Sequence, residues 1–259
     1  MTDQAMHNLG VGTAPQEART VEHEPQHGHV AHQFDDAVQQ HEAATLGMWA
    51  FLATEVLFFG GLFTAYAVYR YRNDQAFALG SHQLKMWLGA LNTAVLLCSS
   101  LTMAMAVRAA HHNEPKPLGR YLMATCALGI AFLGIKAVEW TQDYHEGLIP
   151  QIRWGPRYWT GKEGDERKDR ISEATKGTDV SDNFLISRIE LFFVFYFIMT
   201  GLHGLHMLIG ALLVGGLIVL TLRGRYNIGH ANLVEMIGLY WHFVDIVWIF
   251  LFPLLYLVK

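Results

Sequence analysis

Five long apolar runs constrain this chain more than any other feature of its sequence. Each run is long enough to cross a hydrocarbon core about 30 Å thick, which requires about 20 helical residues. Every run is continuously apolar and lacks the alternating pattern of barrel strands, so helices are the structure that satisfies its backbone groups in lipid. The sequence therefore predicts an all-α fold, an integral membrane bundle of five transmembrane helices. The expected spans are 46–69, 86–107, 121–140, 191–222 and 236–258.

Two hydrophilic stretches lie outside these spans. Residues 1–45 contain seven carboxylates and six histidines but no long apolar run, which predicts a hydrophilic, His-rich N-terminal tail. The tail lacks the features of a cleaved signal peptide, so we expect it to remain on the protein. Residues 161–182 carry 12 charged side chains in 22 positions, so the segment 147–187 is expected to be a charged, solvated outer loop. The five-helix membrane domain is then expected over 46–259.

The lysines and arginines of the short loops predict the orientation of the bundle, because positive residues concentrate on the cytoplasmic side. A cytoplasmic N-terminus places five of them in inner loops and three in the short outer loop. The inner ones are Arg108, Lys116, Arg120, Arg223 and Arg225, and the outer ones are Arg70, Arg72 and Lys85. This preference predicts the N-terminus inside and the C-terminus outside.

Seven acidic, basic or histidine residues fall within the predicted spans. A charged residue at a helix centre costs about 2.5–3.5 kcal/mol, so each of them needs a partner or a hydrated cavity. A rise of about 1.5 Å per residue predicts two polar layers at different depths. Glu55, His242 and Asp245 are expected in an inner layer, and Lys136, Glu139, His203 and His206 are expected farther out.

The spacing of these residues predicts how they pair. Lys136 and Glu139 are three positions apart, as are His242 and Asp245, so each pair shares a helix face and can partly neutralise itself. Glu55 has no charged partner on its own helix and needs one from another helix. Either these groups are hydrogen-bonding contacts between helices, or they form a proton path or a regulatory contact.

His203 and His206 raise the alternative of a haem protein, since buried helical histidines can ligate haem iron. Bis-histidine ligation would require a facing histidine from another helix, and His242 is the only other histidine within a span. Its expected depth lies nearer the inner side. Cys98 and Cys126 have no metal-site spacing. We therefore expect no catalytic residue and no haem, metal or other redox cofactor site in this chain.

Further histidines occur outside the spans. His111, His112 and His230 fall in loops assigned to the inner side, and six more lie in the tail. Imidazole with an unperturbed pKa of about 6.5 exchanges protons readily near neutral pH, so these residues could form a proton antenna. The alternative is that they are ordinary solvated residues of loops and tail.

Five sequence segments together resemble subunit III of cytochrome c oxidase, a haem-copper oxidase. The segments are LGMWAFLATEVLFFGGLFTAY at 46–66, LGALNTAVLLCSS at 88–100, LGIKAVEW at 133–140, GLHGLHMLIG at 201–210 and YWHFVDIVWIFLFPLLYL at 240–257. They occupy all five predicted spans in the family's order, and the resemblance covers about residues 41–258.

The resemblance implies counterparts for individual residues. It matches Glu55 to the family's intramembrane glutamate, His203 and His206 to its paired histidines, and Trp241, His242 and Asp245 to its C-terminal signature. None of these is a redox ligand in that family. Its haems and oxygen-reducing copper lie in subunit I, and its electron-entry copper pair lies in subunit II.

The resemblance also implies a role for the whole chain, as a non-catalytic accessory subunit of a terminal respiratory oxidase in a bacterial inner membrane. Such a complex passes electrons from cytochrome c to oxygen and translocates protons. The expected partners are subunit I, subunit II and membrane phospholipid, with no nucleic acid. The expected contribution is to stabilise subunit I and to support proton uptake.

The N-terminal region departs from the longer form of this family. That form has seven helices, the first two of which form one arm of a lipid-filled cleft, and this chain has a hydrophilic tail in their place. Five-helix relatives occur in bacterial oxidases, including quinol oxidases. The glutamate in LATEVLFF is closer to the cytochrome c branch. A quinol oxidase or nitric oxide reductase complex is the alternative, and an independent haem protein or transporter is the third hypothesis.

Overall fold

The computed structural model describes residues 37–159, 161–176, 181–224 and 230–258. Within these residues the chain is mostly helical. The elements in order are α1 (Ala37–Arg72), α2 (Asp74–Ser81), α3 (Met86–His111), α4 (Pro115–His145), β1 (Leu148–Ile149), β2 (Arg153–Trp154), α5 (Gly161–Thr175), α6 (Asp182–Leu222) and α7 (Ala231–Tyr256). The tail histidines at positions 7, 23, 27, 29 and 32 lie outside the described residues.

Five of the helices, α1, α3, α4, α6 and α7, are long and apolar enough to cross a membrane. They contain four of the five apolar runs in full and the last one as far as Tyr256, which confirms the prediction of an all-α chain with five long apolar helices. Ser181 caps the longest helix, α6, by accepting a hydrogen bond from the Phe184 N–H. At about 1.5 Å per residue, the 41 residues of α6 extend about 60 Å, so α6 projects beyond a hydrocarbon core of about 30 Å.

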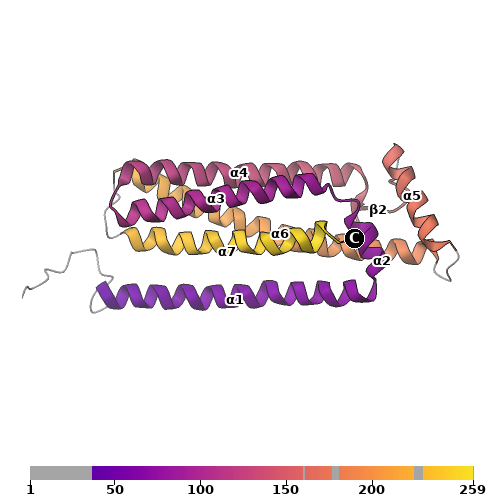
Figure 1. The fold of residues 1–259 in the computed structure, drawn as a ribbon, viewed down its shortest axis with the longest axis horizontal. Helices are drawn as coiled ribbons and strands as arrows, with labels where there is room; N and C mark the ends of the chain where they lie inside the picture. Colours follow the sequence, from indigo (N-terminus) through magenta and orange to yellow (C-terminus); the bar gives the residue numbers. More distant parts are fainter. Residues whose placement is uncertain (1–36, 160, 177–180, 225–229, 259) are drawn as a thin grey trace, which may run out of the picture.

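Helices α3, α4, α6 and α7 lie side by side in one bundle, and α1 runs along one side of it (Figure 1). Aromatic rings fill the interior, including the buried Phe132, Trp241 and Trp248. Two glycines admit the Trp241 ring, since a β-carbon at Gly129 would lie 2.7 Å from it and one at Gly210 would lie 3.1 Å from it. Helices α4, α6 and α7 therefore approach closely around this indole.

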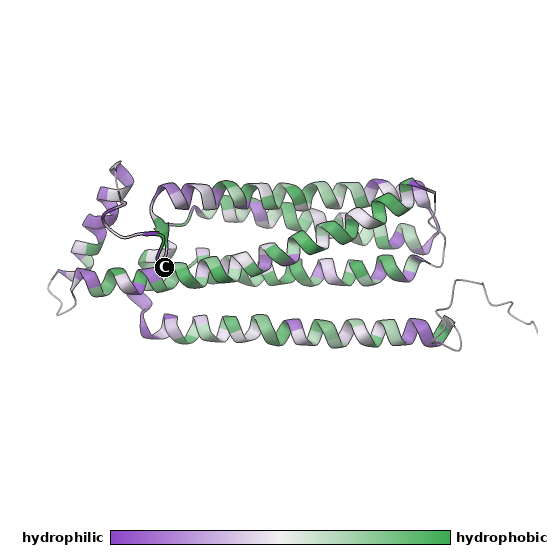
Figure 2. Cartoon of the chain, turned by 180° about the vertical axis from the view of Figure 1, so that it is seen from behind, coloured by the Kyte–Doolittle hydropathy of each residue, from purple (hydrophilic) through white to green (hydrophobic). Residues whose placement is uncertain are grey.

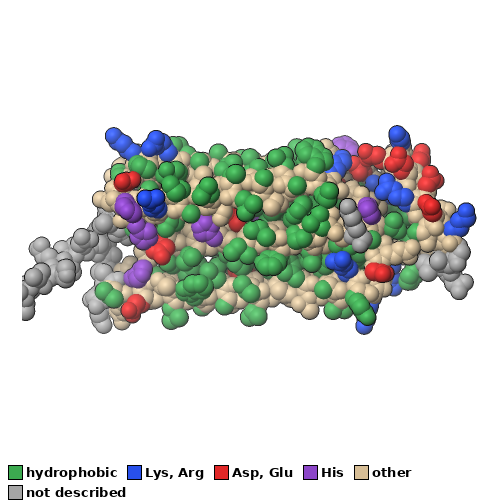
Figure 3. All heavy atoms as spheres, viewed as in Figure 1, with side chains coloured by type: hydrophobic (Ala, Val, Ile, Leu, Met, Phe, Trp, Pro, Cys, Tyr) green, Lys and Arg blue, Asp and Glu red, His purple; other side chains and the backbone are tan. Residues whose placement is uncertain are grey.

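The outer surface of the bundle is apolar across its middle and polar at both ends (Figures 2 and 3). Large apolar side chains such as Leu57 on α1 and Leu212 on α6 are exposed there. A surface of this kind suits lipid, because charged groups are costly in hydrocarbon and are tolerated at its margins. The chain is therefore a multi-pass membrane protein with five candidate spans.

The two ends of the bundle carry different segments. Helix α1 begins at the same end of the bundle as that where α3 ends and α7 begins (Figure 1). At this end His111 of α3 and Glu235 of α7 form an ion pair at 3.4 Å. Helices α2 and α5, the β-hairpin and the C-terminal end of α7 lie at the opposite end. We call these the α1-start end and the hairpin end.

The charged segment 147–187 contains more structure than its composition predicts. Strands β1 and β2 form an antiparallel hairpin in which Leu148 pairs with Trp154. The Trp154 ring lies edge-on to the buried Trp159 ring at 5.6 Å, and α5 packs against α6. The expectation of a solvated loop is therefore corrected to a folded unit, the α5 cap, which comprises residues 148–159 and 161–175.

Arg167 attaches α5 both to Trp159 of the cap and to Glu146 at the end of α4. Its guanidinium lies over the Trp159 ring at 5.3 Å and forms an ion pair with Glu146 at 3.4 Å. Burial lowers the pKa of the Arg167 guanidinium, and the Glu146 carboxylate opposes that shift. Arg167 and Ile171 are four positions apart and both are buried, so α5 has one inward-facing stripe. Because many charged residues surround this stripe, the sequence composition did not indicate a packed helix here.

Candidate functional site within the membrane helices

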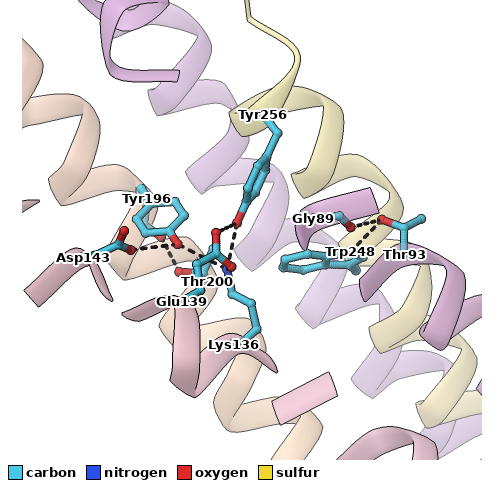
Figure 4. A network of polar contacts seen from close by, with 9 residues as sticks. All are labelled: Gly89, Thr93, Lys136, Glu139, Asp143, Tyr196, Thr200, Trp248 and Tyr256. Carbon is cyan, nitrogen blue, oxygen red and sulfur yellow. Dashed lines mark hydrogen bonds and ion pairs between the residues drawn. The ribbon is translucent and has the colours of Figure 1, made fainter. Parts of the chain in front are cut away.

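Lys136 of α4 lies in a closed network of polar groups inside the bundle (Figure 4). Its Nζ is 2.9 Å from Glu139 Oε2, 2.9 Å from the Tyr256 hydroxyl and 3.3 Å from the Tyr196 hydroxyl. Lys136 and Glu139 are only 7% and 2% exposed. The ion pair that their spacing predicts is therefore present and buried. An ammonium group has three donors, and this site offers three oxygen partners.

The network joins three helices. Tyr256 of α7 donates a hydrogen bond to Glu139 at 2.5 Å, and Tyr196 of α6 donates to Asp143 at 3.3 Å. The sequence alone did not identify Asp143 or the two tyrosines as part of this site. Asp143 follows the predicted span 121–140, and tyrosines near span ends are typical of the membrane interface. The arrangement connects α4, α6 and α7 and holds the Lys136 ammonium in one place.

Glu55 of α1 meets His206 of α6, with 3.1 Å between Oε2 and Nε2. The other ring nitrogen, Nδ1, lies 2.8 Å from the Leu202 carbonyl oxygen, which can only accept, so Nδ1 carries a proton. The contact between Glu55 and Nε2 then requires one further proton, held either by the imidazole or by the carboxyl group. The structure thus supplies the partner from another helix that Glu55 needs.

This pairing corrects the predicted polar layers, in which Glu55 was expected in the inner layer and His206 farther out. Depth was counted from the ends of the apolar runs, whereas α1 begins at Ala37, nine residues before its run starts at position 46. Helix α6 ends with its run, at Leu222. Counted from the helix ends at the α1-start end, Glu55 lies 18 residues into α1 and His206 lies 16 residues before the end of α6. At about 1.5 Å per residue these positions are at about 27 Å and about 24 Å, which places them level.

His203 lies one turn before His206 and has a different environment. It is buried, and its ring packs edge-on against Phe132 at 5.4 Å and beside Trp248 at 5.1 Å. Neither ring nitrogen has a hydrogen-bond partner among the described residues. In that same part of the chain, no three or more His, Cys, Asp or Glu residues form a group that could hold a metal ion.

His242 and Asp245 form no ion pair with each other in the described structure, so the neutralisation predicted from their spacing is wrong. His242 Nδ1 is instead hydrogen-bonded to the Ser100 hydroxyl of α3 at 2.8 Å. Asp245 is 3% exposed, and neither carboxylate oxygen has a hydrogen-bond partner among the described residues. The three side chains line a cavity of about 200 Å³ between α3 and α7. Residues three apart share a helix face, but their side chains need not meet.

The loop histidines gather at the α1-start end. His111 Nε2 lies 3.4 Å from Glu235 Oε2, and the exposed His112 ring turns back to the Arg108 carbonyl at 2.9 Å. His230 immediately precedes α7 at the same end. These positions agree with grouping the three histidines, and their part in proton exchange remains a prediction.

The family model of cytochrome c oxidase subunit III matches residues 26–147 and 179–259. The matched ranges contain all five long helices and leave out the α5 cap. The chain is 31% identical over 225 residues to the cytochrome c oxidase subunit 3 of Thermostichus vulcanus, which covers 86% of this chain and 91% of that protein.

Two further relatives carry a different description. The chain is 25% identical over 230 residues to the "Probable quinol oxidase subunit 3" of Staphylococcus saprophyticus, which covers 89% of this chain and 96% of that protein. It is 24% identical to the protein of the same description from Staphylococcus aureus, with the same coverage.

Proposed function

This chain belongs to the cytochrome c oxidase subunit III family, and we propose that it serves in an oxidase that takes electrons from cytochrome c. The chain is subunit III of a haem-copper terminal oxidase. The observation that carries the choice of donor is the higher identity to a cytochrome c oxidase subunit, 31%, than to the probable quinol oxidase subunits, 25% and 24%. The glutamate in LATEVLFF, Glu55, supports the same branch by resemblance.

The identity of the electron donor is tested on the purified membrane complex that contains this chain. We expect the complex to oxidise reduced cytochrome c and to show the absorption of an electron-entry copper pair. A quinol oxidase subunit is the second candidate, because the probable quinol oxidase relatives align over 89% of the chain. Oxidation of quinol without oxidation of cytochrome c would assign the chain to that branch.

The chain contributes no redox centre in this proposal. Its membrane histidines do not converge, since His203 lies among aromatic rings, His206 meets Glu55 and His242 meets Ser100. This donor set does not fit a haem iron or a protein-bound metal, both of which need ligands aimed at one point. The haems and coppers are assigned to subunits I and II, with this chain stabilising subunit I and contacting membrane phospholipid.

We propose that the α1-start end faces the bacterial cytoplasm. The lysine and arginine count supports this orientation, with five such residues in the inner loops and three in the short outer loop. Membrane-impermeant thiol labelling of single cysteines tests it on intact cells. Labelling of a cysteine at Lys168, in the α5 cap, and protection of one at Lys116 would support the orientation, and the reverse pattern would invert it.

Proton uptake is the proposed contribution to turnover. His111, His112 and His230 lie together at the end assigned to the cytoplasm. Imidazoles and carboxylates on one surface can collect protons and pass them on, which supports an antenna beside the proton entry of subunit I.

A further inference from the structure

One membrane cavity contains a polar group that the rest of the chain leaves unsatisfied. The cavity lies between α3 and α7, measures about 200 Å³ and is lined by Ser100, His242 and Asp245 together with apolar side chains. Both Asp245 carboxylate oxygens are buried without a hydrogen-bond partner among the described residues. We call it the Asp245 cavity.

Ser100 does not satisfy the hydrogen-bonding capacity of the Asp245 carboxyl group. Its hydroxyl borders the Asp245 carboxyl group but is hydrogen-bonded to His242 Nδ1 at 2.8 Å. Even a hydroxyl turned toward Asp245 carries a single proton and could satisfy only one of the two oxygens. A carboxyl group left without partners in hydrocarbon is costly, so an occupant that donates hydrogen bonds is expected.

The other buried carboxyl groups of the bundle provide a comparison. Glu139 accepts from Lys136 and from Tyr256, and Asp143 accepts from Tyr196. Asp245 therefore stands apart from the buried carboxylates that the described part of the chain pairs internally.

The mouth of the cavity opens on the outside of the bundle. Leu97 of α3 and Ile246 of α7 line it and are 53% and 51% exposed. Asp245 lies 14 residues after the start of α7 and 11 before its end, about 21 Å and about 17 Å along the helix. A lipid headgroup does not reach this depth, and an acyl chain has no hydrogen-bond donor. A neighbouring transmembrane helix meets both requirements.

We propose that the α3–α7 face around the Asp245 cavity is the docking surface for a transmembrane helix of oxidase subunit I, which inserts a hydrogen-bond-donating side chain toward Asp245. The apolar rim formed by Leu97 and Ile246 packs against the apolar surface of that helix. This inference rests on the proposed function, because it requires that the chain belongs to an assembled oxidase.

The first test is photocrosslinking in the intact complex. A benzophenone side chain replaces Leu97 or Ile246 at the rim, and Leu212 of α6, which is 69% exposed, serves as the control position. We expect illumination to join both rim positions to subunit I and to leave the α6 position labelled by lipid. Rim positions that label only lipid would overturn the proposal. A chain that does not co-purify with an oxidase at all would instead contradict the proposed function.

The second test separates docking from folding. Asp245→Leu removes an unsatisfied group from the chain but also removes the acceptor, whereas Asp245→Asn keeps a carbonyl acceptor. We expect normal abundance of both variants in membranes, a loss of most subunit I from the purified Asp245→Leu complex, and retention of most of it with Asp245→Asn. Full retention of subunit I by Asp245→Leu would overturn the proposal. It would show that nothing essential binds in the cavity and that water alone can fill it.

Discussion

Lys136 and Glu139 are three positions apart on α4 and form a buried ion pair with 2.9 Å between Nζ and Oε2. The pair does not stand alone, because Tyr256 of α7 contacts both charges and Tyr196 of α6 contacts the ammonium. Three helices therefore share one electrostatic centre within a low-dielectric bundle, where an unpaired charge is far more costly than a paired one.

Removing one charge of this pair should be worse than removing both. Glu139→Ala leaves the Lys136 ammonium buried without its counter-charge, which is expected to cost about 3–5 kcal/mol of stability. The double variant Lys136→Leu/Glu139→Leu leaves only tyrosine hydroxyls with fewer partners, at about 1–3 kcal/mol. The measurements are the yield of assembled complex and its thermal unfolding. Equal losses in the single and double variants would contradict the pairing.

The contact between Glu55 and His206 should appear as energetic coupling between α1 and α6. In a double-mutant cycle with Glu55→Gln and His206→Leu, we expect a coupling energy of about 0.6–1.7 kcal/mol, as for other hydrogen bonds between membrane helices. Unfolding of the complex in graded denaturant measures it. The matched control pairs Glu55→Gln with His203→Leu, because His203 does not contact Glu55, and these effects should add. Additivity in both cycles would argue against the interhelical contact.

Two glycines of α4 should respond oppositely to alanine. A β-carbon at Gly129 would lie 2.7 Å from the Trp241 ring, whereas one at Gly134 would meet no atom within 4 Å. Gly129→Ala is therefore expected to destabilise the bundle by about 1–3 kcal/mol, because the rigid indole must move. Gly134→Ala should be neutral or stabilise the helix by up to about 1 kcal/mol. Thermal unfolding of the two variants side by side decides between these outcomes.

Arg167 should hold the α5 cap in place. Arg167→Ala removes the ion pair to Glu146 and the contact with the Trp159 ring, which together are expected to contribute about 1–3 kcal/mol. Hydrogen exchange of the α5 amides should then accelerate about 5- to 140-fold, since about 1.4 kcal/mol corresponds to a factor of ten. Lys168→Ala breaks only the exposed pair with Asp165 and should change exchange little. A similar response of the two variants would remove Arg167 from this role.

Long apolar runs and local spacing made part of this structure predictable. A continuous apolar run leaves the backbone no alternative to helix in lipid, so the five membrane helices follow from the sequence directly. Lys136 and Glu139 could be paired because the contact lies within one helix. His242 and Asp245 have the same spacing and yet do not pair, because Ser100 of a different helix offers His242 a hydrogen bond.

Contacts between helices were not predictable in the same way. Glu55 and His206 are 151 positions apart, and their common depth depends on where α1 begins, nine residues before its apolar run. The α5 cap was concealed because charged side chains surround a short inward stripe containing Arg167 and Ile171. Tertiary packing decides such features, and the composition of one segment does not encode its neighbours.

The proton antenna is tested by the pH dependence of turnover. Free imidazole has a pKa of about 6.5, so an antenna of histidines and carboxylates should matter most at alkaline pH, where protons are scarce. Two variants remove its parts separately: deletion of residues 1–36, which leaves α1 intact, and His111→Gln/His112→Gln. Each is expected to retain turnover at about pH 7 and to lose about half or more of it at about pH 9.

His82 supplies the control for this experiment, because it lies just after α2, at the hairpin end and away from the proposed antenna. His82→Gln removes one imidazole from the chain without touching the α1-start end, so its pH profile should match that of the parent complex. Steady-state oxygen consumption of fully assembled complexes, from about pH 7 to about pH 9, compares the three variants. If the deletion and His111→Gln/His112→Gln both follow the parent curve as His82→Gln does, the histidines at the α1-start end are ordinary surface residues and protons reach subunit I without them.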